Sequence, residues 1–310
     1  MERQINQIAL SVSNLVESMA WYGALGLEAS GGSGGPRSGS ERAKMLRLPE
    51  AEARMEWLVG RNPMTQLELF HFTKPSPRPW PPTRTARDEG YGSISIFVVA
   101  FEQLLDRLKS SARPFEITGA PGSRSLWVRD PDGIPVELME RDVLASEPIQ
   151  ADGAKLAGIR AVSLTVSDLR RVEDFWTSAL GFSPVSADLY AFNPPPSWWS
   201  DGAEWQERVL KGGSILVRLL APTSGYIINR PGDYRLSDIG VLNIAAICDS
   251  ADAHQRFIEV LQASGFELSV PAPQSSGPQS AVLYGYDPLG NSVETGYLVP
   301  GLEGKFGWRR

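Results

Sequence analysis

The chain has 310 residues, which is enough for two domains of about 150 residues that each bury a core. Its 30 lysines and arginines stand against 36 aspartates and glutamates, and no dense basic run occurs, so the electrostatic footprint of a nucleic-acid-binding protein is missing. The single cysteine excludes an intramolecular disulfide and a CxxC metal site, and no apolar run reaches the roughly 18 residues of a membrane span. We therefore expect a cytoplasmic protein without nucleic-acid or membrane partners.

The sequence repeats itself in two halves. QIALSVSNL at 7–15 returns as AVSLTVSDL at 161–169, and Asp-Pro-Asp-Gly at 130–133 returns as Asp-Pro-Leu-Gly at 287–290. Each glycine is followed four residues later by a glutamate, namely Glu137 and Glu294. Two landmarks repeated in the same order indicate two copies of one domain. We place them at 1–145 and 158–310, joined by a polar linker at 146–157.

The first half opens with a strand and a helix. Large apolar residues alternate with small or polar ones from Ile5 to Val12, which predicts a half-buried strand. A helix is expected from Leu15 to Leu25, because Ser13-Asn14 can cap its start and Gly26 can end it. A Gly/Ser-rich mobile loop is expected at 31–40. Strands are predicted at 43–48, 54–59 and 66–72, so the order is βαβββ.

The same order recurs three more times. The second unit is predicted to have a strand at 94–99, a helix at 101–111, and strands near 115, 125–128 and 134–139. The third has a strand from 159, a helix at 169–180, and strands at 207–210 and 214–220. The fourth has a strand at 242–247, a helix at 252–264 and a hairpin at 287–290. Four βαβββ units predict an α+β fold of two tandem domains, each a pair of units forming a cupped mixed sheet.

Three polar side chains occupy strand positions where burial is costly. Glu68 lies two residues before Phe70 and therefore shares its sheet face, Glu137 lies among apolar neighbours in 135–139, and Gln7 heads a face of small residues. A buried carboxylate needs a charged partner or a metal. Two carboxylates and an amide oxygen suit a divalent cation with an open position. Periodicity alone also allows both glutamates to be exposed or at a sheet edge.

Two segments resemble a known superfamily. Residues 7–27, with Trp21-Tyr22 and Leu25-Gly26-Leu27, are similar to the opening signature of the vicinal oxygen chelate superfamily, and residues 129–138 resemble its closing signature. That group includes glyoxalase I, extradiol dioxygenases and bleomycin-resistance proteins. The resemblance covers both halves, and it implies paired βαβββ modules that form a cupped sheet around a metal.

The resemblance implies four ligand positions in each half. In the first half they are held by Gln7, Glu68, Ser93 and Glu137. In the second half they are held by Ala161, Leu216, Asn243 and Glu294. The first set is similar to the Gln, Glu, His, Glu set of glyoxalase I except at Ser93, and the lost imidazole favours Mg²⁺ or Mn²⁺ over Zn²⁺. The second set keeps one good ligand, so the second half is expected to lack a metal, with Glu294 as a relic or an ion-pair partner.

Aromatic and basic side chains suggest a binding wall. Trp198, Trp199 and Trp205 follow a Pro-rich stretch and are expected either to form a lid over an apolar substrate or to seal the two halves together. Ser93 is a further candidate for substrate contact, and an arginine such as Arg78, Arg84 or Arg218 could bind a substrate carboxylate.

The leading hypothesis is a metal-dependent lyase or isomerase acting on a small oxygenated, hydrophobic or aromatic compound. Gln7, Glu68 and Glu137 would hold the ion (Mg²⁺, Mn²⁺, Zn²⁺ or Fe²⁺), and Glu137 or Glu68 would serve as general base. One alternative is a metal-free protein that sequesters an aromatic ligand. Another is a ring-cleaving dioxygenase, which is disfavoured because the chain has only two histidines, His71 and His254. The sequence leaves a homodimer open.

Overall fold

The computed structural model describes residues 4–111, 113–186, 190, 192–277 and 279–309, and it shows an α+β fold with two mixed sheets. The ten-stranded sheet contains β1 (Ile5–Ser11), β2 (Glu28–Gly32), β3 (Arg37–Ser38), β4 (Glu52–Val59), β5 (Gln66–Lys74), β14 (Gly240–Cys248), β15 (Glu267–Leu268), β16 (Gln274–Gly277), β17 (Ser280–Tyr286) and β18 (Ser292–Leu298). The eight-stranded sheet contains β6 (Gly90–Phe97), β7 (Glu116–Thr118), β8 (Ser125–Arg129), β9 (Pro135–Met139), β10 (Gly158–Thr165), β11 (Ser183–Val185), β12 (Trp205–Gly212) and β13 (Ile215–Pro222). The predicted fold class is thus confirmed.

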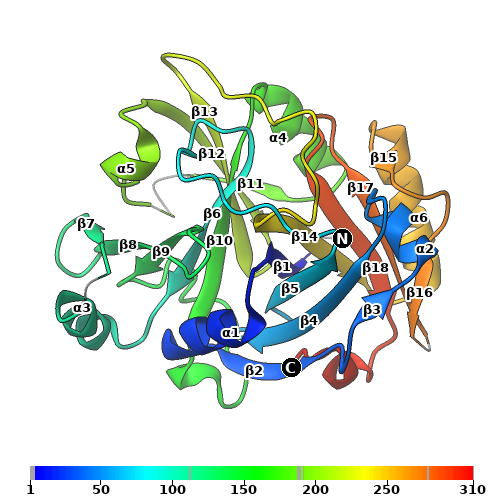
Figure 1. Cartoon of the computed structure of the whole chain (residues 1–310), viewed down its shortest axis with the longest axis horizontal. Helices are drawn as coiled ribbons and strands as arrows, with labels where there is room; N and C mark the ends of the chain where they lie inside the picture. The colour runs from blue at the N-terminus through cyan, green and yellow to red at the C-terminus, as the bar shows by residue number, and fades with distance from the viewer. Residues whose placement is uncertain (1–3, 112, 187–189, 191, 278, 310) are drawn as a thin grey trace.

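Helices lie around the outside of the two sheets (Figure 1). They are α1 (Leu15–Ala24), α2 (Ser40–Met45), α3 (Phe101–Lys109), α4 (Leu169–Ser178), α5 (Ser197–Ser200) and α6 (Ala251–Ala263), with short 3₁₀ turns η1 (Gly153–Lys155) and η2 (Glu303–Phe306). The side chain of Asn14 caps α1 by accepting from the backbone N–H groups of Val16 and Glu17, as the sequence predicts. Within the described residues, no helix is long and apolar enough to cross a membrane.

Each sheet takes one βαβββ unit from each half of the chain. β1 pairs antiparallel with β14, which joins the first unit to the fourth, and β6 pairs antiparallel with β10, which joins the second to the third. The expectation that the two units of one half close a cup together is therefore wrong. Period-two burial identifies the strands and their faces, but it does not specify which strand lies beside which. The division of the sequence at 146–157 remains a proposal about the repeat.

The Gly-rich stretch of the first unit contains strands. β2 begins before the loop predicted at 31–40 and pairs with β4, while residues 43–48, predicted as a strand, form the end of α2 and the turn that follows it. The glycines permit this edge strand, because a Cβ at Gly31 would lie 3.2 Å from the Trp57 ring. Residues 40–45 read Ser-Glu-Arg-Ala-Lys-Met, a run dominated by good helix formers.

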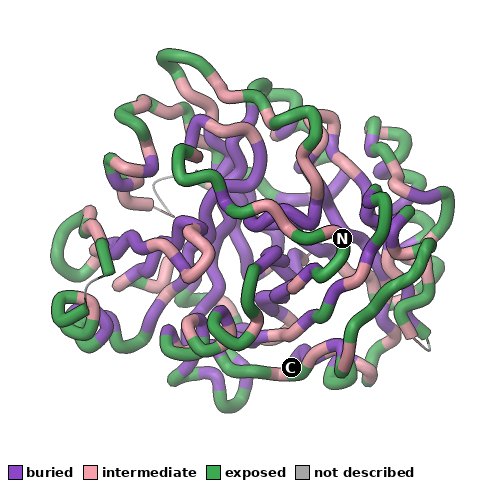
Figure 2. Tube along the Cα trace, in the orientation of Figure 1, coloured by how far each residue is buried: buried purple, intermediate pink, exposed green. Residues whose placement is uncertain are grey.

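The two sheets share one apolar core. Buried residues of β1, β6, β10 and β14, such as Ile8, Ile96, Val162 and Ile244, belong to a single contiguous cluster. Figure 2 shows this as buried chain through the middle of the molecule, with exposed chain mostly at its margin. A second cluster, including Phe70, lies in the ten-stranded sheet beside the cavity described next.

Candidate functional site

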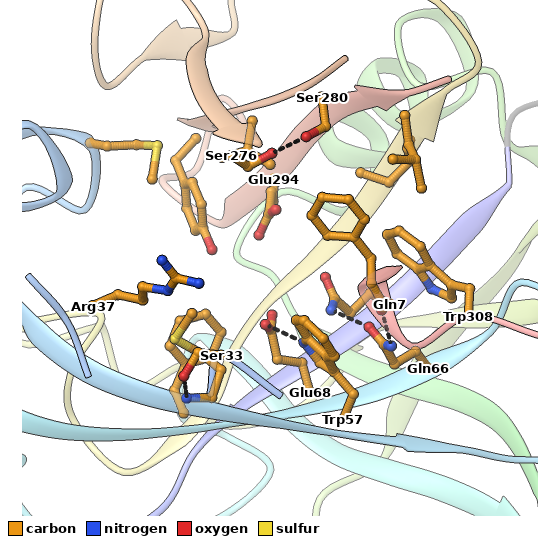
Figure 3. Close-up of a pocket in the computed structure, with 18 of the residues that line it drawn as sticks. Gln7, Ser33, Arg37, Trp57, Gln66, Glu68, Ser276, Ser280, Glu294 and Trp308 are labelled. Atoms are coloured by element: carbon orange, nitrogen blue, oxygen red, sulfur yellow. Dashed lines mark hydrogen bonds between the residues drawn. The ribbon is translucent and has the colours of Figure 1, made fainter. Parts of the chain in front are cut away.

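A cavity of about 230 Å³ opens in the ten-stranded sheet between the first and fourth units. Gln7 on β1, Glu68 on β5 and Glu294 on β18 line it. Figure 3 shows both carboxylates and the amide oxygen of Gln7 directed into the same space. The cavity thus gathers polar groups from segments nearly 290 residues apart in sequence, as the pairing of β1 with β14 requires.

The two carboxylates of the cavity carry an electrostatic penalty. Burial, together with the negative charge of Glu294, raises the pKa of Glu68 well above its usual range, and burial also raises the pKa of Glu294. Neither carboxylate forms an ion pair with any described residue. Trp57 donates its indole N–H to Oε1 of Glu68 at 2.9 Å, which fixes that carboxylate. A cation between the two groups would remove the penalty.

A chain of amides orients Gln7. Gln66 donates its Nε2–H to the carbonyl of Phe306 at 2.8 Å, and Gln7 donates its Nε2–H to Oε1 of Gln66 at 2.6 Å. Because both side-chain nitrogens are used as donors, the orientation of each amide follows from the network. Oε1 of Gln7 is left as an acceptor on the cavity side (Figure 3).

Asn243 completes the set from β14. Its Nδ2 donates to Oε2 of Glu294 at 3.4 Å. Its Oδ1 is buried and has no hydrogen-bond partner among the described residues. A buried acceptor without a donor is costly, and a bound cation would satisfy it. The sequence analysis assigned Asn243 and Glu294 to a site without metal. Glu294 could have been identified as a site residue, because it follows its turn glycine at the same spacing as Glu137.

The residues of this set suit a divalent cation. Two carboxylates and two amide oxygens form an all-oxygen donor set, the kind preferred by Mg²⁺ and Mn²⁺, and Asn243 stands where the resemblance implies a histidine. The orphaned Oδ1 of Asn243 and the lack of an ion pair to Glu68 or Glu294 among the described residues fit the same conclusion. Among the described residues no three His, Cys, Asp or Glu side chains form a metal cluster, so the amides are essential to the fit.

The structure does not bring Glu137 together with Gln7 and Glu68. Glu137 lies on β9 in the eight-stranded sheet, fully buried, so the predicted ligand set of Gln7, Glu68 and Glu137 is wrong as a single site. Ser95 and Ser125 each donate a hydroxyl to Glu137 at 2.6 Å. The prediction fails because each sheet combines one unit from each half of the chain. Glu137 therefore shares a sheet with β10 of the second half, and Glu294 shares a sheet with β1 of the first half.

Arg218 supplies the positive charge beside Glu137 in the eight-stranded sheet, which we call the second cup. In the parallel pairs, Glu68 stands beside Ala9 and Arg218 beside Ser163, so Arg218 is the counterpart of Glu68, in place of the predicted Leu216. The guanidinium contacts Glu137 at 3.3 Å and Glu207 at 2.5 Å, and it stacks on Phe192 at 4.0 Å. Arg218 was a candidate for substrate contact, but these carboxylates already engage it.

The remaining predicted contacts also lie away from the cavity. Ser93 shares a hydrogen bond of 2.8 Å with Ser163, and Trp199 is buried with its ring 6.4 Å from that of Trp80 in the other half of the chain. Trp198 packs under Arg129 at 4.4 Å, and Trp205 lies at the start of β12. None of Ser93, Trp198, Trp199, Trp205 or Arg218 lines the cavity that holds Glu68.

The cavity wall is aromatic and its rim is basic. The rings that line it are Trp57, Phe70, Tyr284, Tyr297, Phe306 and Trp308. Arg37 and Arg42 are the basic residues of the lining, and Figure 3 shows Arg37 pointing toward the carboxylates. Neither His71 nor His254 lines the cavity, and His254 instead contacts Oγ1 of Thr295 at 3.0 Å.

The buried carboxylates predict an unusual pH dependence of stability. Without metal, the folded protein keeps protons on Glu68 and Glu294 at pH values where a free glutamate, with a pKa of about 4.3, is ionised. The folded state then binds more protons than the unfolded state, so the contribution of the pair is fully present below about pH 4 and is lost as pH rises through the raised pKa. We expect the free energy of unfolding in urea, measured with EDTA, to fall between about pH 5 and pH 8.

Asp130 contributes to this trend with the same sign, because burial raises its pKa to about 7. The variant Glu68→Gln/Glu294→Gln isolates the pair, and its pH dependence should be flatter than that of the wild type. Equal slopes for the two proteins would contradict the assignment.

Comparisons with known proteins agree with this architecture. The model of the Glyoxalase/Bleomycin resistance protein/Dioxygenase superfamily matches residues 4–138. Glyoxalase I from Zea mays is 16% identical, with 96% of this chain and 92% of that chain covered and a TM-score of 0.63. A putative dioxygenase from Bacillus subtilis is 14% identical, with 97% and 86% covered and a TM-score of 0.64. No curated protein sequence matches the chain. Residues 4–138 thus match the Glyoxalase/Bleomycin resistance protein/Dioxygenase superfamily, and over 96% of its length the chain has a fold similar to that of maize glyoxalase I.

Proposed function

We propose that the protein is a divalent-metal-dependent isomerase or lyase that moves a proton on a small oxygenated compound. The observation that carries the proposal is the pair of buried carboxylates, Glu68 and Glu294, that face one cavity with the oriented amide oxygen of Gln7 beside them and Asn243 hydrogen-bonded to Glu294. The residues that would hold the ion are Gln7, Glu68, Asn243 and Glu294. When bound, the ion supplies Lewis-acid stabilisation of negative charge on a substrate oxygen.

Glu68 is the group best placed to move the proton. Trp57 holds Oε1 of Glu68, while no described residue donates a hydrogen bond to Oε2, which can accept a proton from the carbon beside a carbonyl. A general base works best when its pKa lies near the operating pH, and burial shifts the pKa of Glu68 in that direction. Glu294 is held by Asn243 and is better suited to a fixed position.

The wall of the cavity defines the rest of the substrate. Trp57, Phe306 and Trp308 form a run of rings with centroids 6.5 Å and 6.3 Å apart, which favours an apolar or aromatic substituent and excludes water from the carboxylates. Arg37 and Arg42 make no ion pair among the described residues, so they are available to an anionic group at the rim.

Metal content and proton exchange test this proposal together. Elemental mass spectrometry on protein dialysed against Mg²⁺ or Mn²⁺ should give close to one ion per chain. With 2-hydroxyacetophenone as probe, NMR in deuterated water should show deuterium entering the carbon beside the carbonyl, and EDTA should stop the exchange. Protein that neither retains an ion nor exchanges the proton would overturn the proposal.

A second candidate is sequestration of an aromatic ligand without metal, which the ring-lined wall favours. It is separated from the first by tryptophan fluorescence in EDTA, since a sequestering protein should show strong quenching by aromatic drugs under those conditions. Replacement of Trp57 by phenylalanine should then remove part of the signal.

A further inference from the structure

A second cavity, of about 390 Å³, lies between the segment that joins β5 to β6 and the segment that joins β13 to β14. The two segments correspond in the repeat, so that Trp80-Pro81 matches Arg230-Pro231 and Gly90 matches Gly240. None of its lining residues lines the cavity that holds Glu68. We propose that this second cavity binds a small organic monocarboxylate between Arg84 and Arg230.

The repeat explains how the arginines are positioned. Each glycine makes room for a large side chain from the other segment: a Cβ at Gly90 would lie 2.7 Å from Arg230, and a Cβ at Gly240 would lie 2.9 Å from the Trp80 ring. Both glycines have positive φ, at 110° and 147°. Arg84 then lies over the Trp80 ring, with its guanidinium carbon 4.2 Å from the ring centre.

The arginines of this cavity differ in their partners. Arg78 is neutralised by Asp233 at 2.5 Å and by Asp238 at 2.6 Å. Arg84 and Arg230 form no ion pair with any described residue. Two unpaired guanidinium groups in one cavity repel each other, and an anion between them would replace that repulsion by two attractive contacts.

Arg84 has fewer hydrogen-bond partners than Arg230 among the described residues. It donates one hydrogen bond, to the carbonyl of Tyr91 at 2.8 Å, while its Nε is buried without a hydrogen-bond partner among the described residues. Burial is the main cause that lowers the pKa of Arg84; Tyr234 and Asp88 offset part of this effect, and the nearby charge of Arg230 adds slightly to it. Arg230 donates to Asn291 at 2.5 Å and to the carbonyl of Gly290, which keeps its guanidinium in place.

The remaining lining determines the class of anion. Asp88 accepts from the backbone N–H of Thr85 at 2.8 Å, and Glu89 accepts from Ser167 at 2.6 Å, so these carboxylates have partners of their own but keep negative charge near the cavity. They disfavour a dianion such as phosphate. Pro81, Leu236, Ile239, Val241 and Leu242 supply an apolar wall. A single carboxylate with a short apolar tail fits this combination, and the volume is near the lower end for small-molecule sites.

Isothermal titration of the full-length protein with hexanoate and benzoate tests the site. We expect both carboxylates to bind, and Arg84→Gln or Arg230→Gln to weaken binding at least about tenfold, because each variant loses a charge-assisted hydrogen bond. Hexanamide and inorganic phosphate should bind at least about tenfold more weakly than hexanoate. Circular dichroism checks that each variant is folded. If a glutamine variant does not fold, the corresponding Arg84→Lys or Arg230→Lys variant, which keeps the positive charge, is measured in its place.

The matched control is Arg37→Gln/Arg42→Gln, which changes the basic rim of the other cavity. Hexanoate affinity should be unchanged in this variant, so the outcome is independent of the proposed enzyme activity. Loss of binding in the control, unchanged binding in both Arg84→Gln and Arg230→Gln, or no binding to the wild type at millimolar ligand would overturn the proposal.

Discussion

Changing Glu68 and Glu294 together to glutamine is expected to remove the bound divalent ion and stop proton exchange on the probe. Removing both charged ligands should weaken the metal by more than about 100-fold, because even the loss of supporting groups around a metal costs 10–100-fold. Glu68→Gln alone should lower the exchange rate by about 10²–10⁴-fold, since it also removes the general base. Elemental analysis after dialysis and deuterium incorporation give the two measurements.

Glu137→Gln is the matched control for this experiment. It makes the same change at the corresponding glutamate of the other sheet, where Ser95, Ser125 and Arg218 surround the side chain. A folded Glu137→Gln protein should retain metal and exchange at wild-type levels. Loss of metal in that control, or its retention in the double variant, would show that the ligand set is assigned to the wrong sheet.

The internal repeat made much of the architecture predictable. The predicted helix starts at Leu15, Phe101 and Leu169 coincide with those of α1, α3 and α4, and both Gly turns close the hairpins expected of them. These features depend on local patterns: period-two burial, an N-cap and a glycine with positive φ. The pairing of β1 with β14 could not be obtained in this way, because it depends on contacts between segments about 230 residues or more apart.

In the candidate site, too, local sequence patterns predicted some residues and missed those that depend on three-dimensional contacts. Glu68 and Gln7 were identified from costly polar positions on apolar strands, and both line the cavity. Leu216 was matched to Glu68, although strand register gives Arg218. The two residues are two positions apart and share a sheet face, so periodicity identified the face and missed the position. Asn243 was placed at a ligand position but not counted as a good ligand, because its importance lies in a buried, unpaired oxygen, which only three-dimensional contacts reveal.

Arg218 fills in the eight-stranded sheet the role that we propose for a metal in the ten-stranded sheet. Its side chain is 5% exposed and lies against the fully buried Glu137. Arg218→Met is expected to destabilise the protein by about 3–5 kcal/mol in urea unfolding, because it leaves a buried carboxylate without a counter-charge. The double variant Arg218→Met/Glu137→Gln should recover much of this loss, since it removes both charges.

Arg208→Met is the control, because it removes an exposed arginine from the adjacent strand. Arg208 is 47% exposed and contacts Glu173 at 3.5 Å, so its loss should cost no more than about 1 kcal/mol. If Arg218→Met were as mild as this control, the buried Glu137 would not depend on Arg218 as a counter-charge. The second cup would then need no internal cation, and the inference that Arg218 takes the place of a metal there would fail. A large loss in the single variant with recovery in the double variant means that this cup is stabilised by its own ion pair, which leaves the ten-stranded sheet as the location for metal chemistry.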